Sequence, residues 1–169
     1  MKENIAITGF MGSGKTTVGK ILAKKLGWSF FDLDRIIELS EDRKIPDIFT
    51  QDGEKYFRKT ESRIIKKTIG GNKNCVFSCG GGVVLKGENM GAIGKKCHIV
   101  YLMISPQEAA KRLKDSADRP LLLNKDKEKE ISDLLGKRLE SYKKYAEITI
   151  DNNNLLPEKA ADLIISKLE

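Results

Sequence analysis

The segment Gly9–Thr16, of sequence GFMGSGKT, constrains the fold of this chain more than any other feature. It matches the pattern G-x-x-x-x-G-K-[ST] and lies between an apolar, strand-like run at Ile5–Thr8 and a stretch with helical periodicity. Glycines permit backbone angles that other residues resist, so successive N–H groups can point at one anion. A glycine-rich turn that precedes Lys-Thr by chance is the alternative, but the flanking strand and helix argue against it. The segment therefore predicts a strand–loop–helix unit that holds the phosphates of a nucleoside triphosphate.

The charged and hydroxyl side chains of this loop indicate how the nucleotide is held. We expect the ammonium group of Lys15 to neutralise the β- and γ-phosphates and the hydroxyl of Thr16 to coordinate Mg²⁺. The start of the following helix adds the positive end of its dipole. ATP is therefore the expected co-substrate and Mg²⁺ the expected cofactor. The residues of this loop that are predicted to bind ATP are Gly12, Ser13, Gly14, Lys15, Thr16 and Thr17.

Apolar runs alternate with helical segments along the rest of the chain. The strand-like runs are Ile5–Thr8, Ser29–Asp32, Cys75–Cys79, His98–Ile104 and Glu147–Asp151. Between them, apolar residues recur three and four positions apart, which is typical of amphipathic helices, and the last helix is expected to start after Pro157. Short strands separated by helices predict an α/β fold in three layers, with a parallel sheet covered by helices on both faces. The length of 169 residues fits a single domain that spans residues 1–169.

One polar stretch interrupts this alternation. Residues 114–129 are rich in charge and contain Arg119-Pro120, so we predict a mobile lid at about residues 113–127. A mobile arginine such as Arg119 suits the closing of a lid over a transferring phosphoryl group. Arg138 follows on a helical segment with an apolar stripe. Taken alone, either arginine is equally compatible with ordinary surface charge.

The composition argues against several classes of function. No apolar run is long enough to cross a bilayer, and no signal sequence precedes the first strand-like run. The net charge of +7 arises from Lys and Arg interspersed with Glu on helices, which is typical of solvated faces, and no nucleic-acid-binding motif is present. We therefore expect a cytoplasmic monomer that binds neither membranes nor nucleic acids. The three cysteines form no C-x-x-C pair and are interpreted as apolar fillers of the core.

Two aspartates follow the second strand-like run, in the sequence FDLD at residues 31–34. In an extended chain residues i and i+2 face the same side, so we expect Asp32 and Asp34 to point into one crevice at the carboxyl ends of the strands. One can hold a water molecule of the metal shell, and the other can accept a hydrogen bond from an acceptor hydroxyl. A helix cap at Asp34 is the alternative, and the two roles are compatible. No acid follows the strand at Cys75–Cys79, so Asp32 is the expected organiser of the metal.

Three consecutive glycines, Gly80-Gly81-Gly82, follow that same strand. A flexible turn does not need three glycines, so we predict a close approach of the backbone to a ligand. Arg58 and Glu61 lie three residues apart on a helical segment, and Glu61 shares its face with apolar residues. We predict an ion pair that holds the guanidinium still for a carboxylate ligand, with a solvated surface pair as the alternative.

Taken together, these segments resemble the shikimate kinase family. The similar segments span nearly the whole chain and are, in order, GFMGSGKTTVGKILAKKLG, FFDLD, DIFTQDGEKYFRKTE, SCGGGVVL, DRPLL and RLESYKKYAEITID. The resemblance implies a nucleoside-monophosphate-kinase-like fold with a five-stranded parallel sheet and a lid. It also implies transfer of the γ-phosphoryl group of ATP to the 3-hydroxyl of shikimate. A kinase for another small acid such as gluconate, and a nucleotide-binding regulator without catalysis, are the alternatives.

The resemblance further implies a role for each site residue. Asp34, Arg58, Gly81 and Arg138 would bind shikimate, with the two arginines on its carboxylate and Asp34 on its acceptor hydroxyl. On the nucleotide side, the implied residues are Lys15 and Arg119 for the transferring phosphoryl group, Thr16 for direct and Asp32 for water-mediated binding of Mg²⁺, and Arg112 and Asn154 for the adenine. Lys15, Asp34 and Arg119 would then be the catalytic residues.

Overall fold

The computed structural model describes residues 2–114 and 127–168, and these residues contain a sheet of five parallel strands. The strands are β1 (Asn4–Thr8), β2 (Ser29–Asp32), β3 (Cys75–Ser78), β4 (Cys97–Met103) and β5 (Ile148–Asp151). Their order across the sheet is β2-β3-β1-β4-β5. Each strand-like run of the sequence overlaps one of these strands, and the predicted five-stranded parallel sheet is confirmed.

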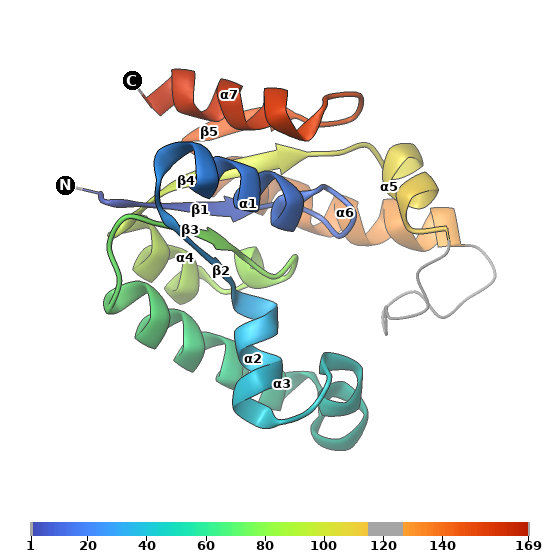
Figure 1. Ribbon diagram of the computed structural model, residues 1–169. Helices are drawn as coiled ribbons and strands as arrows, with labels where there is room; N and C mark the ends of the chain where they lie inside the picture. The colour runs from blue at the N-terminus through green and yellow to red at the C-terminus, as the bar shows by residue number, and fades with distance from the viewer. Residues whose placement is uncertain (1, 115–126, 169) are drawn as a thin grey trace.

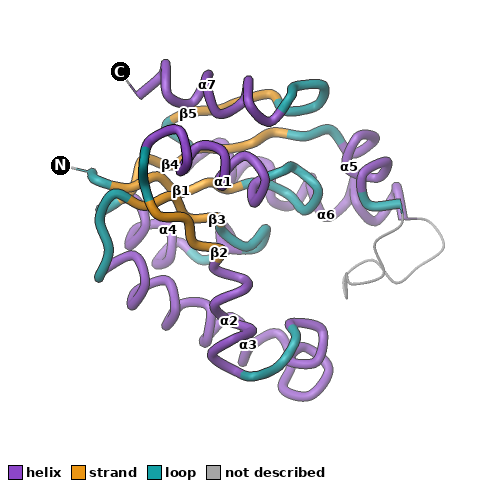
Figure 2. Tube along the Cα trace, viewed as in Figure 1, coloured by secondary structure: helices purple, strands orange, loops and turns teal. Residues whose placement is uncertain are grey.

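Helices cover both faces of the sheet, as Figures 1 and 2 show. Helices α1 (Lys15–Leu26) and α7 (Pro157–Leu168) pack together on one face, whereas α4 (Gly87–Gly94) and α6 (Lys127–Tyr145) lie on the other. The remaining helical elements are α2 (Leu33–Glu41), α3 (Ile45–Gly70), the short 3₁₀ helix η1 (Val83–Leu85) and α5 (Pro106–Arg112). This arrangement confirms the predicted three-layer α/β architecture.

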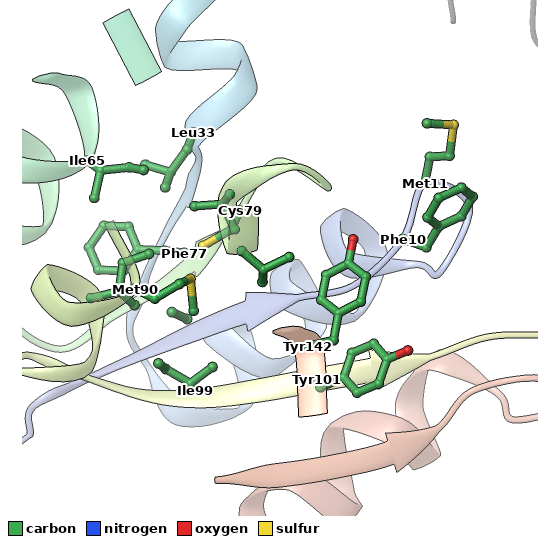
Figure 3. Close-up of a cluster of buried hydrophobic side chains, with 14 of the residues drawn as sticks. Phe10, Met11, Leu33, Ile65, Phe77, Cys79, Met90, Ile99, Tyr101 and Tyr142 are labelled. Atoms are coloured by element: carbon green, nitrogen blue, oxygen red, sulfur yellow. The ribbon is translucent and has the colours of Figure 1, made fainter. Parts of the chain in front are cut away.

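The side chains of the central strand β1 alternate between the two layers. Ile5 and Ile7 join the apolar cluster beneath α1 and α7, whereas Ala6 joins the cluster on the opposite face together with Phe77. Because both faces of the strand are covered, β1 has a nearly continuous apolar sequence. Figure 3 shows the second cluster. All three cysteines are free and buried within it, in agreement with their interpretation as apolar fillers: Cys75, Cys79 and Cys97.

The sheet topology brings the functional segments together at the carboxyl ends of the strands. In a parallel sheet the carboxyl ends of all strands point the same way, so the loops after β1, β2, β3 and β5 open on a common side. The chain leaves β1 and enters β2, which is separated from it by β3. A crevice forms at such a switch in strand order. The loop after β1 is the segment Gly9–Thr16. Because β1 is the central strand, this loop lies in the middle of the row of strand ends.

Helices α2 and α3 form an arm beside the sheet (Figure 1). The helical span of α3 contains a break at Gly53, whose backbone angles are φ 79° and ψ 172°. The connection between α2 and α3 is tied to this region by Arg43, which donates hydrogen bonds to Gln51 and Asp52 on α3. The arm therefore provides a wall next to the carboxyl ends of the strands.

The predicted lid at residues 113–127 is centred on residues 115–126, which lie outside the described residues. Within residues 2–114 and 127–168, none of the helices combines the length and the apolar character that crossing a bilayer would require.

Candidate active site

The loop Gly9–Thr16 wraps around the amino end of α1. Gly14 is the N-cap of this helix and has a left-handed backbone with a φ of 88°. Its carbonyl oxygen accepts a hydrogen bond of 2.9 Å from the backbone N–H of Val18. A Cβ on Gly9 would lie 2.6 Å from the carbonyl oxygen of Leu102, so a larger residue does not fit there. The loop therefore presents the first N–H groups of α1, which have no acceptor within the helix, as a site for an anion.

A cavity of about 500 Å³ opens on this loop. Its lining residues are Gly12, Gly14, Lys15, Thr16, Thr17, Val18, Arg112, Asn152, Leu155 and Pro157. Most of the residues predicted to bind ATP line this cavity. Ser13 and Asn154 do not line it, although Asn152 and Leu155 on either side of Asn154 do. An adenine contact by Asn154 therefore stays a prediction.

Arg112 at the end of α5 joins the phosphate loop to the segment after β5. Its guanidinium group donates hydrogen bonds to the carbonyl oxygens of Gly12 (3.2 Å), Asn152 (2.8 Å) and Asn153 (2.9 Å). The carboxylate of Glu108, one turn earlier on α5, accepts a further bond of 2.8 Å from its Nε. The plane of the guanidinium is thus fixed at the wall of the cavity, where a flat base can stack on it.

Thr16 and Asp32 are in direct contact at the metal-binding position that the sequence predicts. The hydroxyl of Thr16 donates a hydrogen bond of 2.8 Å to Oδ2 of Asp32 and lies 3.4 Å from Oγ of Ser78. Two hydroxyls and a carboxylate are hard oxygen donors, which are the ligands that Mg²⁺ prefers, so the donor set fits this ion. Ser78 is not among the predicted site residues. The available signal was its place near the end of the strand-like run before the glycines, whereas its register opposite Asp32 is a finding of the structure.

The alternative that Asp34 caps a helix is wrong. The N-cap of α2 is Asp32, whose Oδ1 accepts a hydrogen bond of 3.3 Å from the backbone N–H of Arg35. Asp34 lies within the first turn of α2, because the extended conformation ends at Asp32. The argument from strand alternation therefore does not apply to this pair. Both carboxylates nevertheless line the same cavity, as expected.

This second cavity has a volume of about 540 Å³ and lies between the phosphate loop, the α2–α3 arm and the glycines after β3. It brings together the four residues predicted to bind the acceptor, which are Asp34, Arg58, Gly81 and Arg138. Ile45, Phe49 and Phe57 contribute an apolar wall that was not predicted from the sequence. These three residues occupy ordinary apolar positions on α3, so sequence alone did not distinguish them from the core.

The glycines after β3 make room for functional side chains. A Cβ on Gly80 would lie 2.7 Å from Oδ1 of Asp34, and one on Gly82 would collide with the guanidinium of Arg58. A substituent at either position would therefore displace a charged group of the cavity. The close approach at these two positions is to protein side chains, whereas the triple glycine predicts a close approach to a ligand, which stays a prediction.

Arg58 and Glu61 form the predicted ion pair, with 3.0 Å between Nη1 of Arg58 and Oε2 of Glu61. Glu61 is only 2% exposed, so the alternative of a solvated surface pair is wrong. Burial raises the pKa of Glu61, and the charge of Arg58 opposes that rise. On its outer side, Arg58 also donates hydrogen bonds of 3.2 Å from Nε and Nη2 to Glu54. Two carboxylates therefore hold the guanidinium in a fixed orientation at the cavity wall.

Arg138 on α6 reaches the cavity from the opposite side and is 3% exposed. Its guanidinium carbon lies 6.0 Å from the centre of the Phe10 ring, and its Nη1 would lie 3.5 Å from a Cβ on Gly81. Among the described residues, the buried Nε of Arg138 has no hydrogen-bond partner.

The hydroxyl of Tyr142, one turn further along α6, donates a hydrogen bond to the carbonyl oxygen of Gly81. Burial raises the pKa of Tyr142, which keeps this hydroxyl protonated as a donor.

The two cavities meet at Lys15 and Thr16, which line both of them. Nζ of Lys15 donates a hydrogen bond of 2.9 Å to the carbonyl oxygen of Phe10 and thus stays at the junction. Arg119, the other predicted cation of the transfer step, lies outside the described residues. The arrangement can hold a polyphosphate in one cavity and a small carboxylate-bearing alcohol in the other, with a lysine between them.

Several known proteins that are similar to this chain over nearly its whole length are described as shikimate kinase. The family model of shikimate kinase matches residues 11–169. The shikimate kinase of Thermodesulfovibrio yellowstonii is 44% identical over 167 residues, which cover 99% of this chain and 95% of that protein. The structure of shikimate kinase from Acinetobacter baumannii in complex with shikimate matches with a TM-score of 0.95 at 33% identity, and the match covers 99% of this chain and 93% of that one.

A gluconokinase from Sinorhizobium meliloti is more distant. Its structure matches with a TM-score of 0.60 at 19% identity, over 99% of this chain and 93% of that one. At this level of identity the likeness extends to the fold alone.

Proposed function

The chain belongs to the shikimate kinase family, and we propose that it transfers the γ-phosphoryl group of ATP to the 3-hydroxyl of shikimate in the two adjoining cavities. The protein is an ATP-dependent kinase, and its substrates are ATP and shikimate. The observation that carries the assignment of the site is the junction of the two cavities at Lys15 and Thr16. Kinases of this kind accelerate transfer mainly by positioning and charge stabilisation, which requires both substrates to meet at one cation.

On the acceptor side, Arg58 and Arg138 bind the carboxylate of shikimate. Both guanidinium groups line the cavity, one held by Glu54 and Glu61 and the other buried on α6. A fixed guanidinium matches a carboxylate with two parallel hydrogen bonds. The carboxylate of Asp34 lies against Gly80 and accepts a hydrogen bond from the 3-hydroxyl. The acceptor is thereby oriented for attack on the γ-phosphorus.

On the donor side, the N–H groups at the start of α1 bind the phosphates, and Lys15 stabilises the transferring group. The oxygen of the 3-hydroxyl forms a bond to the γ-phosphorus while the bond from that phosphorus to the β–γ bridging oxygen breaks, which releases ADP. The proton of the hydroxyl passes to the carboxylate of Asp34, which accepts its hydrogen bond. Arg119 is assigned the second stabilising charge by its family position. Bound Mg²⁺ would neutralise negative charge on the phosphates, with Thr16 as a direct ligand and Asp32 acting through water.

A coupled assay of ADP release tests this proposal. We expect the purified protein to release ADP from ATP when shikimate is present and to remain at background with gluconate. Turnover with gluconate but not with shikimate would support the alternative kinase, and turnover with neither would exclude both. Arg58→Ala tests the carboxylate assignment separately. It should raise the KM for shikimate at least about tenfold, because an ion pair to the carboxylate is lost, and an unchanged KM would remove Arg58 from that role.

A further inference from the structure

Asn152 is a buried polar residue that connects the last strand of the sheet to the phosphate loop. It follows β5, and its backbone N–H donates a hydrogen bond of 2.9 Å to the carbonyl oxygen of Met103, which extends the ladder between β4 and β5. Its side chain reaches the loop, where Nδ2 donates a hydrogen bond of 2.7 Å to the carbonyl oxygen of Ser13. The residue is 3% exposed, so this hydrogen bond is protected from water.

The hydrogen bond to Ser13 fixes the peptide plane between Ser13 and Gly14. In a trans peptide the N–H points opposite to the C=O, so a carbonyl held towards Asn152 turns the N–H of Gly14 to the opposite side. Gly14 has a left-handed backbone, and its neighbour Lys15 lines both cavities. A Cβ on Gly14 would lie 3.1 Å from Nδ2 of Asn152, so the amide also packs directly against the N-cap. The side chain of Asn152 therefore controls one N–H group of the phosphate-binding turn.

The amide oxygen of Asn152 does not take part in holding the loop. Oδ1 of Asn152 is buried and has no hydrogen-bond partner among the described residues. A buried polar atom without a partner carries a free-energy cost, so an apolar residue would serve better if this position only filled space. The feature that distinguishes Asn152 from an apolar filler is its N–H donor to the loop.

We propose that Asn152 is a positioning residue for the nucleotide, which acts by holding the Ser13–Gly14 peptide in the orientation that binds phosphate. The proposal rests on the function proposed above, because it assumes that the loop receives ATP. It extends that function by linking the affinity for the nucleotide to a side chain that follows β5, the edge strand of the sheet. Asn152 touches none of the four residues assigned to the acceptor, so its effect is confined to the donor side.

Three variants test this inference in the full-length chain. Asn152→Asp keeps the shape of the side chain but replaces the N–H donor with an oxygen that repels the carbonyl of Ser13. Asn152→Ala removes the side chain. Asn72→Ala is the matched control, because the amide of Asn72 also donates a hydrogen bond to a backbone carbonyl, that of Thr68 at the carboxyl end of α3, away from the loop. Thermal unfolding establishes that each variant is folded.

We expect both Asn152 variants to raise the KM for ATP at least about tenfold, because a buried hydrogen bond is lost. The KM for shikimate should change less than about twofold, within the scatter of distant, uncoupled sites. Calorimetric titration with ADP, without shikimate, should give the same loss of affinity, whereas Asn72→Ala should bind ADP like the parent. An unchanged affinity for ADP in the folded variants would overturn the inference. An equal rise of both KM values would also overturn it, since a general loosening of the fold affects both substrates. If the parent binds ADP but does not phosphorylate shikimate, the proposed function fails while the role of Asn152 is still tested.

Discussion

The hydroxyl of Thr16 donates a hydrogen bond of 2.8 Å to the carboxylate of Asp32, and this contact joins the first strand–helix unit of the sheet to the second. Thr16 lies in the first turn of α1, the helix after β1, whereas Asp32 ends β2 and caps α2. The metal position and the amino end of the acceptor-binding arm are therefore adjacent. A substitution of Thr16 or Asp32 should therefore affect both the nucleotide side and the acceptor side of the site.

Asp32→Asn should separate the metal role of this residue from its structural role. Asparagine is as good an N-cap as aspartate, so α2 keeps its cap and stability changes little. The loss of negative charge should raise the Mg²⁺ concentration required for half-maximal turnover by about tenfold, which is the typical effect of removing an outer partner of a metal. A titration of activity with Mg²⁺ at saturating ATP measures this shift. Asp47→Asn, at an exposed position in the first turn of α3, is the control and should leave the curve unchanged.

Glu61→Gln should weaken the binding of shikimate although Glu61 is not assigned a contact with it. The carboxylate of Glu61 is buried and holds Arg58 at 3.0 Å, and a neutral amide holds a guanidinium less firmly. We expect the KM for shikimate to rise about tenfold, in line with the loss of a hydrogen bond between charged groups. Glu54→Gln is the matched control, because the side chain of Glu54 is 56% exposed and its bond to Arg58 is screened by water. Equal effects of the two substitutions would contradict this ranking.

The stability of the chain should depend on pH through Glu61. Burial raises the pKa of Glu61 above its ordinary value of 4.5, so the folded state binds this proton more tightly than the unfolded state does. The stabilisation by the bound proton is complete below pH 4.5 and is lost as the pH rises through the raised pKa. Relative to Glu61→Gln, the free energy of unfolding of the parent should fall over that interval, by at most about 1.4 kcal/mol per pH unit. Urea unfolding of both proteins across this range provides the test, and a difference that does not vary with pH would contradict it.

Gly82→Ala should impair acceptor binding without unfolding the protein. The added methyl group meets the end of the Arg58 side chain, which can move, so the fold tolerates it while the guanidinium leaves its position. We expect the KM for shikimate to rise at least about tenfold, the loss expected for a misplaced ionic hydrogen bond, with the KM for ATP unchanged. Gly91→Ala is the control, because nothing lies within 4 Å of a Cβ at this position on α4. It should stabilise the chain by about 0.5–1 kcal/mol through helix propensity and leave both KM values unaltered.

Local patterns in the sequence identified most of the elements and most of the candidate site. The phosphate loop was identified because its glycines, lysine and threonine must be consecutive to bind one anion. The Arg58–Glu61 pair was identified because residues three apart on a helix are neighbours. The assignment of the α2 cap to Asp34 failed because the end of a strand and the start of a helix depend on backbone angles of single residues. In this structure the chain leaves the extended conformation after Asp32.

The sequence by itself determined which segments form strands and helices, and it determined the residues of the loop after β1. Only the tertiary structure decided which of these segments meet. The bond from Asn152 to Ser13 spans 139 positions of the chain, and the contact between Thr16 and Ser78 spans 62. Such contacts follow from the strand order β2-β3-β1-β4-β5. Apolar periodicity does not encode this order, because every buried parallel strand has the same pattern of apolar residues.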